Sequence, residues 1–184
     1  MKSLGPIAAV ALALALPSGI AVAQQSNVRT GRSTAQSLSA QDFVDQVADG
    51  TKFELQSAHI ALRKAQDPAV KRFAERVIND HTKLERQLER TARSDKNIQY
   101  PTNPQITADQ QSKIDQLDNA SGKDFDKTFV NMMADDHEND INLFKSYEAS
   151  GTDSKLKAFA RRGLPKIESH LRKIDKLQAN ENKS

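Results

Sequence analysis

The sequence predicts an all-α fold: four long helices in two helical hairpins, with a short extra helix in the connection between the second and third helices. Apolar residues recur three and four positions apart through four long segments, which is the spacing of one helix face. Turn and cap residues stand only between these segments. Charged residues make up 28% of the 184 residues and aromatic residues 5%, a composition that favours a helical domain over a sheet protein.

Residues 1–23 are predicted to form a secretory signal peptide. Lys2 supplies the positive charge, residues 7–16 are apolar, and residues 21–23 (Ala-Val-Ala) form a small-residue cleavage site, so the mature chain should begin at Gln24. The apolar run is shorter than the ~20 residues that a membrane span needs. We therefore expect a periplasmic or secreted protein with no transmembrane segment after cleavage.

Composition also divides the mature chain and limits its partners. Residues 24–38 are a polar lead expected to be disordered, residues 39–179 form the bundle domain, and residues 180–184 are a tail expected to fray. The chain has no cysteine, which excludes a lipid-modified cysteine and a disulfide framework. Acidic and basic residues are interleaved along every helix, so no basic stripe indicates a nucleic-acid partner. Peripheral association with the envelope stays open, and no other partner is indicated.

Cap residues place the ends of the helices. Ser39 is the expected N-cap of the first helix, and Asp67 with Pro68 should start the second after a junction short enough to make an antiparallel hairpin. Thr107 should cap the short helix, and Asp153 should cap the fourth long one. The expected ranges of the helices, in chain order, are residues 40–66, 68–94, 108–117, 123–149 and 154–178.

Each long helix carries a polar residue in its apolar stripe near the midpoint. The residues are Glu54, His81, Asp136 with the adjacent His137, and His170. A polar group in a core is costly unless it has a partner. At 1.5 Å rise per residue, the first three positions lie roughly 20 Å from either end of their helices, and the fourth lies about one turn off centre. All of them can therefore reach one layer of the bundle.

This layer has two interpretations. Carboxylate oxygens and imidazole nitrogens suit Fe, Mn, Zn or Cu, so the five residues are candidate ligands of one transition-metal ion. The stripe places Asp136 more squarely inside than His137, and Asp140 is close enough to join. Alternatively, pairs such as Glu54–His81 or Asp136–His170 form a buried network that only specifies packing.

Three other polar residues are expected outside the layer. Asp80 and Glu168 lie beside layer histidines in the sequence, but their positions on the predicted helices turn them away from the apolar stripe. They are expected at the surface or behind the ligands. His59 lies off the stripe of its helix and is expected to face solvent.

The helix order and the motifs Asp80-His81, Asp136-His137-Glu138 and the late His170 resemble the bacterial family called domain of unknown function 4142. The resemblance covers roughly residues 39–178. It implies a ferritin-like four-helix bundle outside the cytoplasm, with no established activity.

The sequence departs from the di-iron members of the ferritin-like superfamily. Those proteins have a Glu three residues before the histidine on two helices, whereas Ile78 and Ile167 occupy these positions here. The favoured interpretation is a non-catalytic exported protein with a binding or stress-related accessory role. The alternative is a mononuclear transition-metal-binding protein that uses the layer for metal buffering or redox protection.

Overall fold

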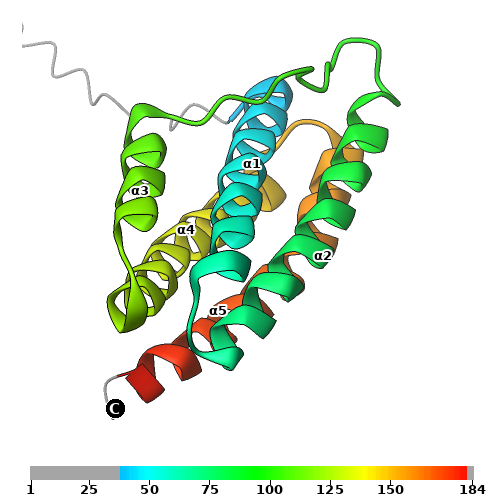
Figure 1. Cartoon of the computed structure of the whole chain (residues 1–184). Coiled ribbons are helices and arrows are strands. Elements are labelled where there is room, and N and C mark those ends of the chain that lie inside the picture. Colours follow the sequence, from blue (N-terminus) through cyan, green and yellow to red (C-terminus); the bar gives the residue numbers. More distant parts are fainter. Residues whose placement is uncertain (1–37, 182–184) are drawn as a thin grey trace, which may run out of the picture. The chain divides into compact units, whose positions relative to one another are not determined.

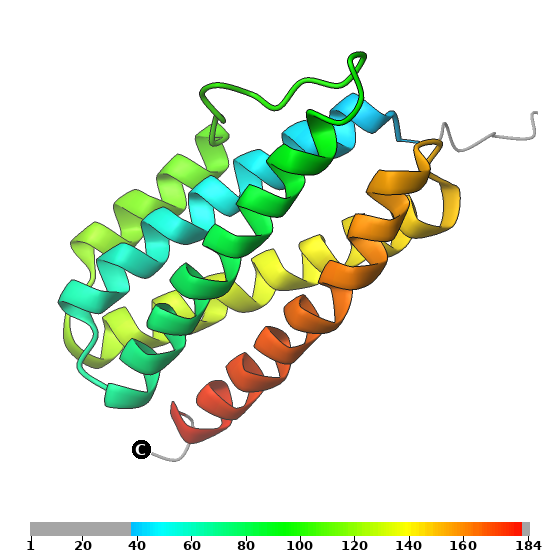
Figure 2. The same cartoon turned by 90° about the vertical axis from the view of Figure 1, so that its right-hand side faces the viewer.

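The computed structural model describes residues 38–181, and helices are the only regular secondary structure in that range (Figure 1). The helices are α1 (Ala40–Lys64), α2 (Pro68–Ala92), α3 (Ala108–Asn119), α4 (Gly122–Ser150) and α5 (Ser154–Glu181). α1 pairs with α2 and α4 pairs with α5, and contacts of α2 with α5 and of α1 with α4 join the two hairpins (Figure 2). The prediction of an all-α protein with two hairpins and a short helix between α2 and α4 is confirmed.

Three predictions fall partly or wholly outside the described residues. The signal peptide lies within residues 1–37, together with all of the polar lead except Leu38. At the other end, α5 runs to Glu181, three residues beyond the expected end at Gln178, so the first two residues of the tail expected to fray are helical, and residues 182–184 lie outside the described range. Among residues 38–181, no helix combines the length and apolar character required to cross a membrane.

The predicted caps form the helix starts. Ser39 Oγ accepts a hydrogen bond from the Asp42 amide at 3.0 Å, and Asp67 Oδ1 accepts one from the Ala69 amide at 2.7 Å. Asp153 Oδ1 accepts from the Leu156 amide at 2.7 Å. These bonds satisfy amides that the first turn of a helix leaves without a partner. They explain why the observed helix starts match the predicted ones.

A buried aspartate ties the first hairpin to α4. Asp126 is 2% exposed, and its carboxylate accepts hydrogen bonds from the amides of Gln66 and Asp67, the shortest at 2.7 Å. These amides belong to the junction between α1 and α2. The start of α4 therefore holds the turn of the first hairpin, and this contact helps to set the height of α1 and α2 relative to α4.

The apolar core consists of two clusters, one toward each end of the bundle. The first cluster includes Phe73, Phe125 and Phe129, and the second includes Phe43, Phe144, Tyr147 and Phe159. Helix α5 comes close to α4 in the second cluster, at Gly163. A side chain there would clash, since a Cβ at Gly163 would lie only 2.8 Å from Cε1 of Phe144.

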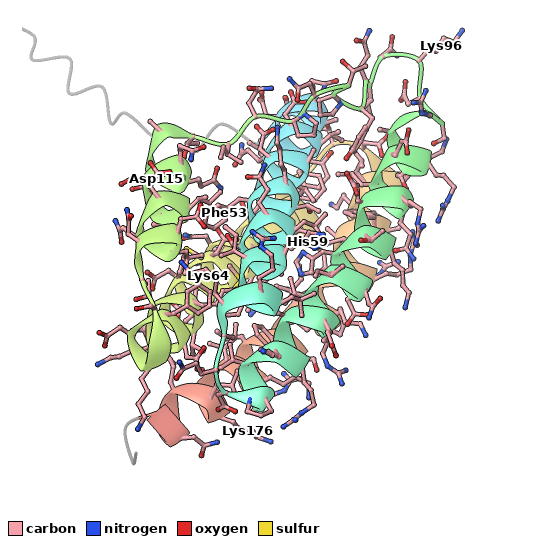
Figure 3. The ribbon with its side chains drawn as sticks, viewed as in Figure 1. Phe53, His59, Lys64, Lys96, Asp115 and Lys176 are labelled. Atoms are coloured by element: carbon pink, nitrogen blue, oxygen red, sulfur yellow. The ribbon has the colours of Figure 1, made fainter. Side chains whose placement is uncertain are left out.

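Helix α3 packs on the outside of α1 and α4. Its apolar side chains Ile114 and Leu117 are buried in the first cluster, and Lys64 Nζ donates to the Leu117 carbonyl at 3.1 Å. Figure 3 shows Phe53 between α1 and α3, and it shows His59 on α1. His59 is exposed, as predicted.

Candidate metal centre

A layer of polar side chains lies between the two apolar clusters. Glu54 on α1, His81 on α2, His137 on α4 and His170 on α5 are each no more than 1% exposed. Every long helix thus contributes one buried polar group at about the same height, as the sequence predicted. Phe73 lies against the layer, with its ring centroid 6.3 Å from that of His137 and 6.0 Å from that of His170.

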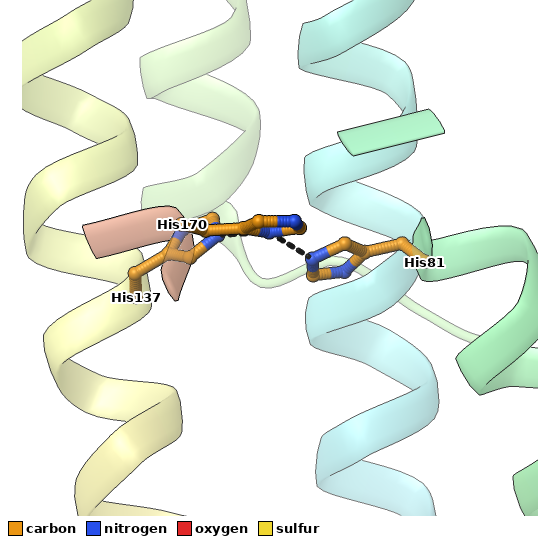
Figure 4. A group of neighbouring side chains, drawn as sticks. All are labelled: His81, His137 and His170. Atoms are coloured by element: carbon orange, nitrogen blue, oxygen red, sulfur yellow. Dashed lines mark hydrogen bonds between the residues drawn. The ribbon is translucent and has the colours of Figure 1, made fainter. Parts of the chain in front are cut away.

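The three histidines form a compact triangle (Figure 4). Their ring centroids are 5.3 to 5.6 Å apart. His170 Nδ1 lies 3.3 Å from His137 Nε2 and 3.4 Å from His81 Nε2. Two nitrogens bound at about 2.05 Å to one tetrahedral ion are about 3.3–3.4 Å apart. Both distances to His170 Nδ1 therefore match those between imidazole nitrogens around a single metal ion.

The outward nitrogens of two histidines determine where their protons lie. His137 Nδ1 lies 2.9 Å from the carbonyl oxygen of Met133, and a carbonyl can only accept, so this nitrogen carries the proton. His170 Nε2 lies 3.0 Å from Asp80 Oδ2 and donates to that carboxylate. In the neutral rings, His137 Nε2 and His170 Nδ1 then both carry lone pairs. They face each other at 3.3 Å with no proton for a hydrogen bond between them.

Protonating a ring would supply the missing proton, but the surroundings oppose it. Burial lowers the pKa of His81 to about 4, although the charges of Asp136 and Asp80 act in the opposite direction. Burial and the charge of His81 lower the pKa of His170 to about 4, and burial lowers that of His137 well below its usual value. All three rings are therefore neutral near pH 7, as metal-binding imidazoles must be.

Glu54 lies beside two of these rings. Its Oε2 is 2.5 Å from His81 Nδ1 and its Oε1 is 3.2 Å from His137 Nδ1. Neither contact is aligned as a hydrogen bond, and no aligned donor to either oxygen of this fully buried carboxyl group lies among residues 38–181. Burial and the charge of Asp136 raise the pKa of Glu54 well above its usual value.

Asp136 and Asp140 extend the layer along α4. One carboxylate oxygen from each of Glu54, Asp136 and Asp140 lies within 4.8 Å of the other two. Burial raises the pKa of Asp136 to about 6, while His81 and Lys113 lower it. Burial and the charges of Glu54 and Asp136 raise that of Asp140 well above its usual value.

The structure corrects one sequence-based prediction at this point. His137 was expected at the edge of the stripe and Asp136 inside, but His137 is 0% exposed and Asp136 is only partly buried. The predicted stripe ran through Met132 and Asp136. The stripe in contact with the core instead runs through Met133, His137 and Ile141, which are spaced by four residues and all buried.

Asp80 lies behind a candidate ligand and Glu168 lies at the surface, which are the positions that the sequence predicted for these two residues. Asp80 has a side chain that is 12% exposed, and it binds both His170 and, at 3.4 Å, Lys166 Nζ. Burial alone would raise the pKa of Asp80, but the hydrogen bond from His170 and the charge of Lys166 lower it. His170 therefore faces Asp80, and not Asp136 as one of the predicted pairs would require. Glu168 forms a surface ion pair with Lys145 at 3.2 Å.

An imidazole held by a carboxylate or carbonyl at one nitrogen and free at the other is typical of metal ligands, because the outer partner fixes the tautomer and the ring orientation. His137 and His170 both have this arrangement. The sequence contains a hint of one partner, because Met133 precedes His137 by one helical turn. No spacing in the sequence shows that Asp80 reaches across to α5.

Fold and site together define the class of this protein: a helical bundle with a buried histidine cluster between two apolar clusters. The chain belongs to the family described as Domain of unknown function (DUF4142), which matches residues 25–177. This family is the one that the sequence motifs resemble. No curated protein matches the sequence of this chain.

Several solved structures share the fold. CopM in the Cu(II)-bound form is 15% identical, with a TM-score of 0.66 over 77% of this chain and 97% of CopM. A DUF305 fragment from Deinococcus radiodurans is 14% identical, with a TM-score of 0.66 over 75% of this chain and 93% of the fragment. A DUF305 protein from Streptomyces coelicolor, described as a predicted secreted protein, is 16% identical, with a TM-score of 0.65 over 76% of this chain and 90% of its own. At this level of identity, the similarity concerns the fold.

Proposed function

We propose that this protein binds a single transition-metal ion, copper or zinc, through His81, His137 and His170, and that it acts in metal buffering outside the cytoplasm. One observation carries the proposal: His137 Nε2 and His170 Nδ1 face each other at 3.3 Å, and outward hydrogen bonds leave no proton between them. Facing lone pairs repel each other in a buried, desolvated site. A cation that accepts both lone pairs removes that repulsion.

The donor set favours copper or zinc. Three imidazole nitrogens suit Zn, Cu, Fe and Ni, and among divalent ions Cu²⁺ generally binds most tightly at nitrogen sites. CopM, a structural neighbour, is known in a Cu(II)-bound form. Three protein ligands leave one position of a tetrahedral ion open, where water or an exchanging ligand can bind.

A buffering role agrees better with this site than an oxidase role does. Ile78 and Ile167 stand where di-iron oxidases of helical bundles carry bridging Glu residues. Burial of the cluster beneath Phe73 also leaves little room for an organic substrate beside the ion. The protein is therefore proposed to be a non-catalytic binding protein.

Export is part of the proposal. It rests on the signal-peptide pattern of residues 1–23 and agrees with the description of the Streptomyces coelicolor neighbour as a predicted secreted protein. N-terminal sequencing of the protein recovered from the periplasm or medium should show Gln24 as the first residue. Exported protein that keeps Met1 would contradict the cleavage.

Metal-dependent thermal stability tests the site. The mature chain, stripped with a chelator, should melt at a higher temperature with Zn²⁺ or Cu²⁺, because an ion that binds only the folded state stabilises it by about 2.7 kcal/mol at 100 times its Kd. His170→Gln should lose most of this gain. His59→Gln is the matched control, since it removes an exposed histidine from the same bundle, and it should keep the gain. No gain in the wild type, or an equal gain in both variants, would show that the histidine cluster is a structural network.

A further inference from the structure

The layer contains a second group of ligating atoms that the histidine cluster does not use, one of them on the buried Glu54 and the others on two partly buried aspartates. Glu54 on α1 and Asp136 and Asp140 on α4 bring carboxylate oxygens within 4.8 Å of one another. The two aspartates are one helical turn apart, so both can face α1. Gly50, one turn before Glu54, lies beside this group, because a Cβ there would be in ordinary van der Waals contact with Asp140 Oδ1, at 3.6 Å.

These carboxylates have few of the partners that a structural network would provide. Glu54 is 0% exposed, and the Nδ1 atoms of His81 and His137 beside its oxygens are not aligned to donate hydrogen bonds. Asp136 Oδ2 is also buried without a donor. Buried carboxylates are normally paired or hydrogen-bonded, or else they coordinate metals. One oxygen of Glu54 lies within 4.8 Å of a carboxylate oxygen of each aspartate, so the three carboxyl groups need a cation or protons between them.

Nearby side chains supply little positive charge. Lys113 on α3 and His81 are the groups that lower the pKa of Asp136, and His81 is itself neutral near pH 7. Three carboxyl groups of one sign therefore share a site that attracts a small, doubly charged ion.

We propose that Glu54, Asp136 and Asp140 bind an oxygen-preferring divalent cation, such as Mn²⁺ or Ca²⁺, beside the histidine cluster. Carboxylate oxygens are the ligands that these hard cations prefer, whereas the histidine nitrogens favour copper or zinc. Glu54 lies between the two sites, because its other contacts are with the outward nitrogens of His81 and His137. The layer is then a centre for two unlike cations, and the carboxylate site does not depend on occupancy of the histidine site.

Titration with Mn²⁺ tests this site directly, because free Mn²⁺ has an EPR signal that weakens when the ion is bound. The mature chain should bind one equivalent, and Ca²⁺ should compete if the site accepts both ions. Asp140→Asn should weaken Mn²⁺ binding at least tenfold. Asp135→Asn is the matched control: it removes an exposed carboxylate from the same helix and should leave Mn²⁺ binding unchanged.

Two further measurements separate this site from the histidine site. Wild-type protein preloaded with one equivalent of Zn²⁺ should still bind Mn²⁺, and Asp140→Asn should keep the thermal stabilisation by Zn²⁺. A melting temperature of Asp140→Asn at or above that of the wild type in chelator shows that the variant is folded. Displacement of Mn²⁺ by the first equivalent of Zn²⁺, equal Mn²⁺ affinity in Asp140→Asn, or no Mn²⁺ binding by the wild type would each overturn the proposal.

Discussion

In the second apolar cluster, the rings of Phe43 and Tyr147 stack with centroids 4.0 Å apart. One layer away, the imidazoles of His137 and His170 are 5.4 Å apart and turn lone pairs toward each other. The same four helices supply both regions. In the cluster, the aromatic rings attract one another directly. In the layer, the facing lone pairs of the two imidazoles repel each other until an ion or a proton binds between them. Stability and metal binding therefore depend on different residues of the same helices.

Placing a charge in an apolar cluster should have the largest effect. Val77 and Phe129 are 0% exposed, so Val77→Asp or Phe129→Asp buries an unpaired carboxylate and should lower the free energy of unfolding by about 4 kcal/mol. Arg86→Ala, at an exposed position of α2, should change it by less than about 0.5 kcal/mol. Chemical denaturation measures all three. Equal losses at the buried and exposed positions would contradict the two clusters.

Within the layer, the effects of substitutions should depend on one another. Glu54 and His81 are in contact, so Glu54→Gln and His81→Gln should be non-additive, with a coupling of roughly 0.5–3 kcal/mol in a double-mutant cycle. His59→Gln should be additive with either one. The cycle measured in chelator reports the side chains alone, and the cycle measured with Zn²⁺ adds the ion. Additivity between Glu54 and His81 in both conditions would mean that these residues do not act together.

The layer should also respond to pH in a way that the clusters do not. The pKa of His170 is about 4 in the folded protein, against a usual value of 6.5. Between these values the unfolded chain binds more protons, so acidification removes stability. Without metal, His170→Gln should remove the part of this loss that His170 causes, while His81 and His137 keep their own. The stability of the variant relative to wild type should therefore be higher at pH 4.5 than at pH 7 by about 2 kcal/mol.

The carboxyl side of the layer should show the opposite sign. The pKa of Asp140 is raised in the folded protein, so its favourable contribution is present at acid pH and is lost as pH rises through that value. In chelator, Asp140→Asn should therefore stabilise the protein at pH 7 and lose this advantage at pH 4. Denaturation curves at the two pH values measure both variants. The same sign for His170→Gln and Asp140→Asn would contradict the charge states assigned to the layer.

The smallest effect concerns a buried hydroxyl near the layer. Ser57 Oγ is buried and has no hydrogen-bond partner in the part of the chain that the structure describes. Ser57→Ala removes this polar atom and should leave the stability unchanged or raise it by less than about 1 kcal/mol. A thermal melt measures the difference, with Arg86→Ala as the reference for a neutral change. A clear loss would reveal a partner for the hydroxyl group and make Ser57 part of the polar layer.

Periodicity and caps were enough to predict the helices, because each stripe and each cap is a local feature of the sequence. They also placed Glu54, His81 and His170 in one layer, since helix length and rise set their heights. Periodicity failed at Asp136 and His137, because adjacent residues differ by about 100° on a helix and packing decides which one turns inward. Asp80 was missed as the partner of His170 for a related reason, since that contact depends on how α2 and α5 pack.

X-ray absorption at the zinc edge tests the central claim most directly, because it reports the ligands around the bound ion. With one equivalent of Zn²⁺, the mature chain should show three imidazole nitrogens at about 2.0–2.1 Å, completed by one light atom. His137→Gln should reduce the imidazole contribution to two rings. A coordination shell of oxygens alone, or a spectrum unchanged by His137→Gln, would contradict binding by the histidine cluster.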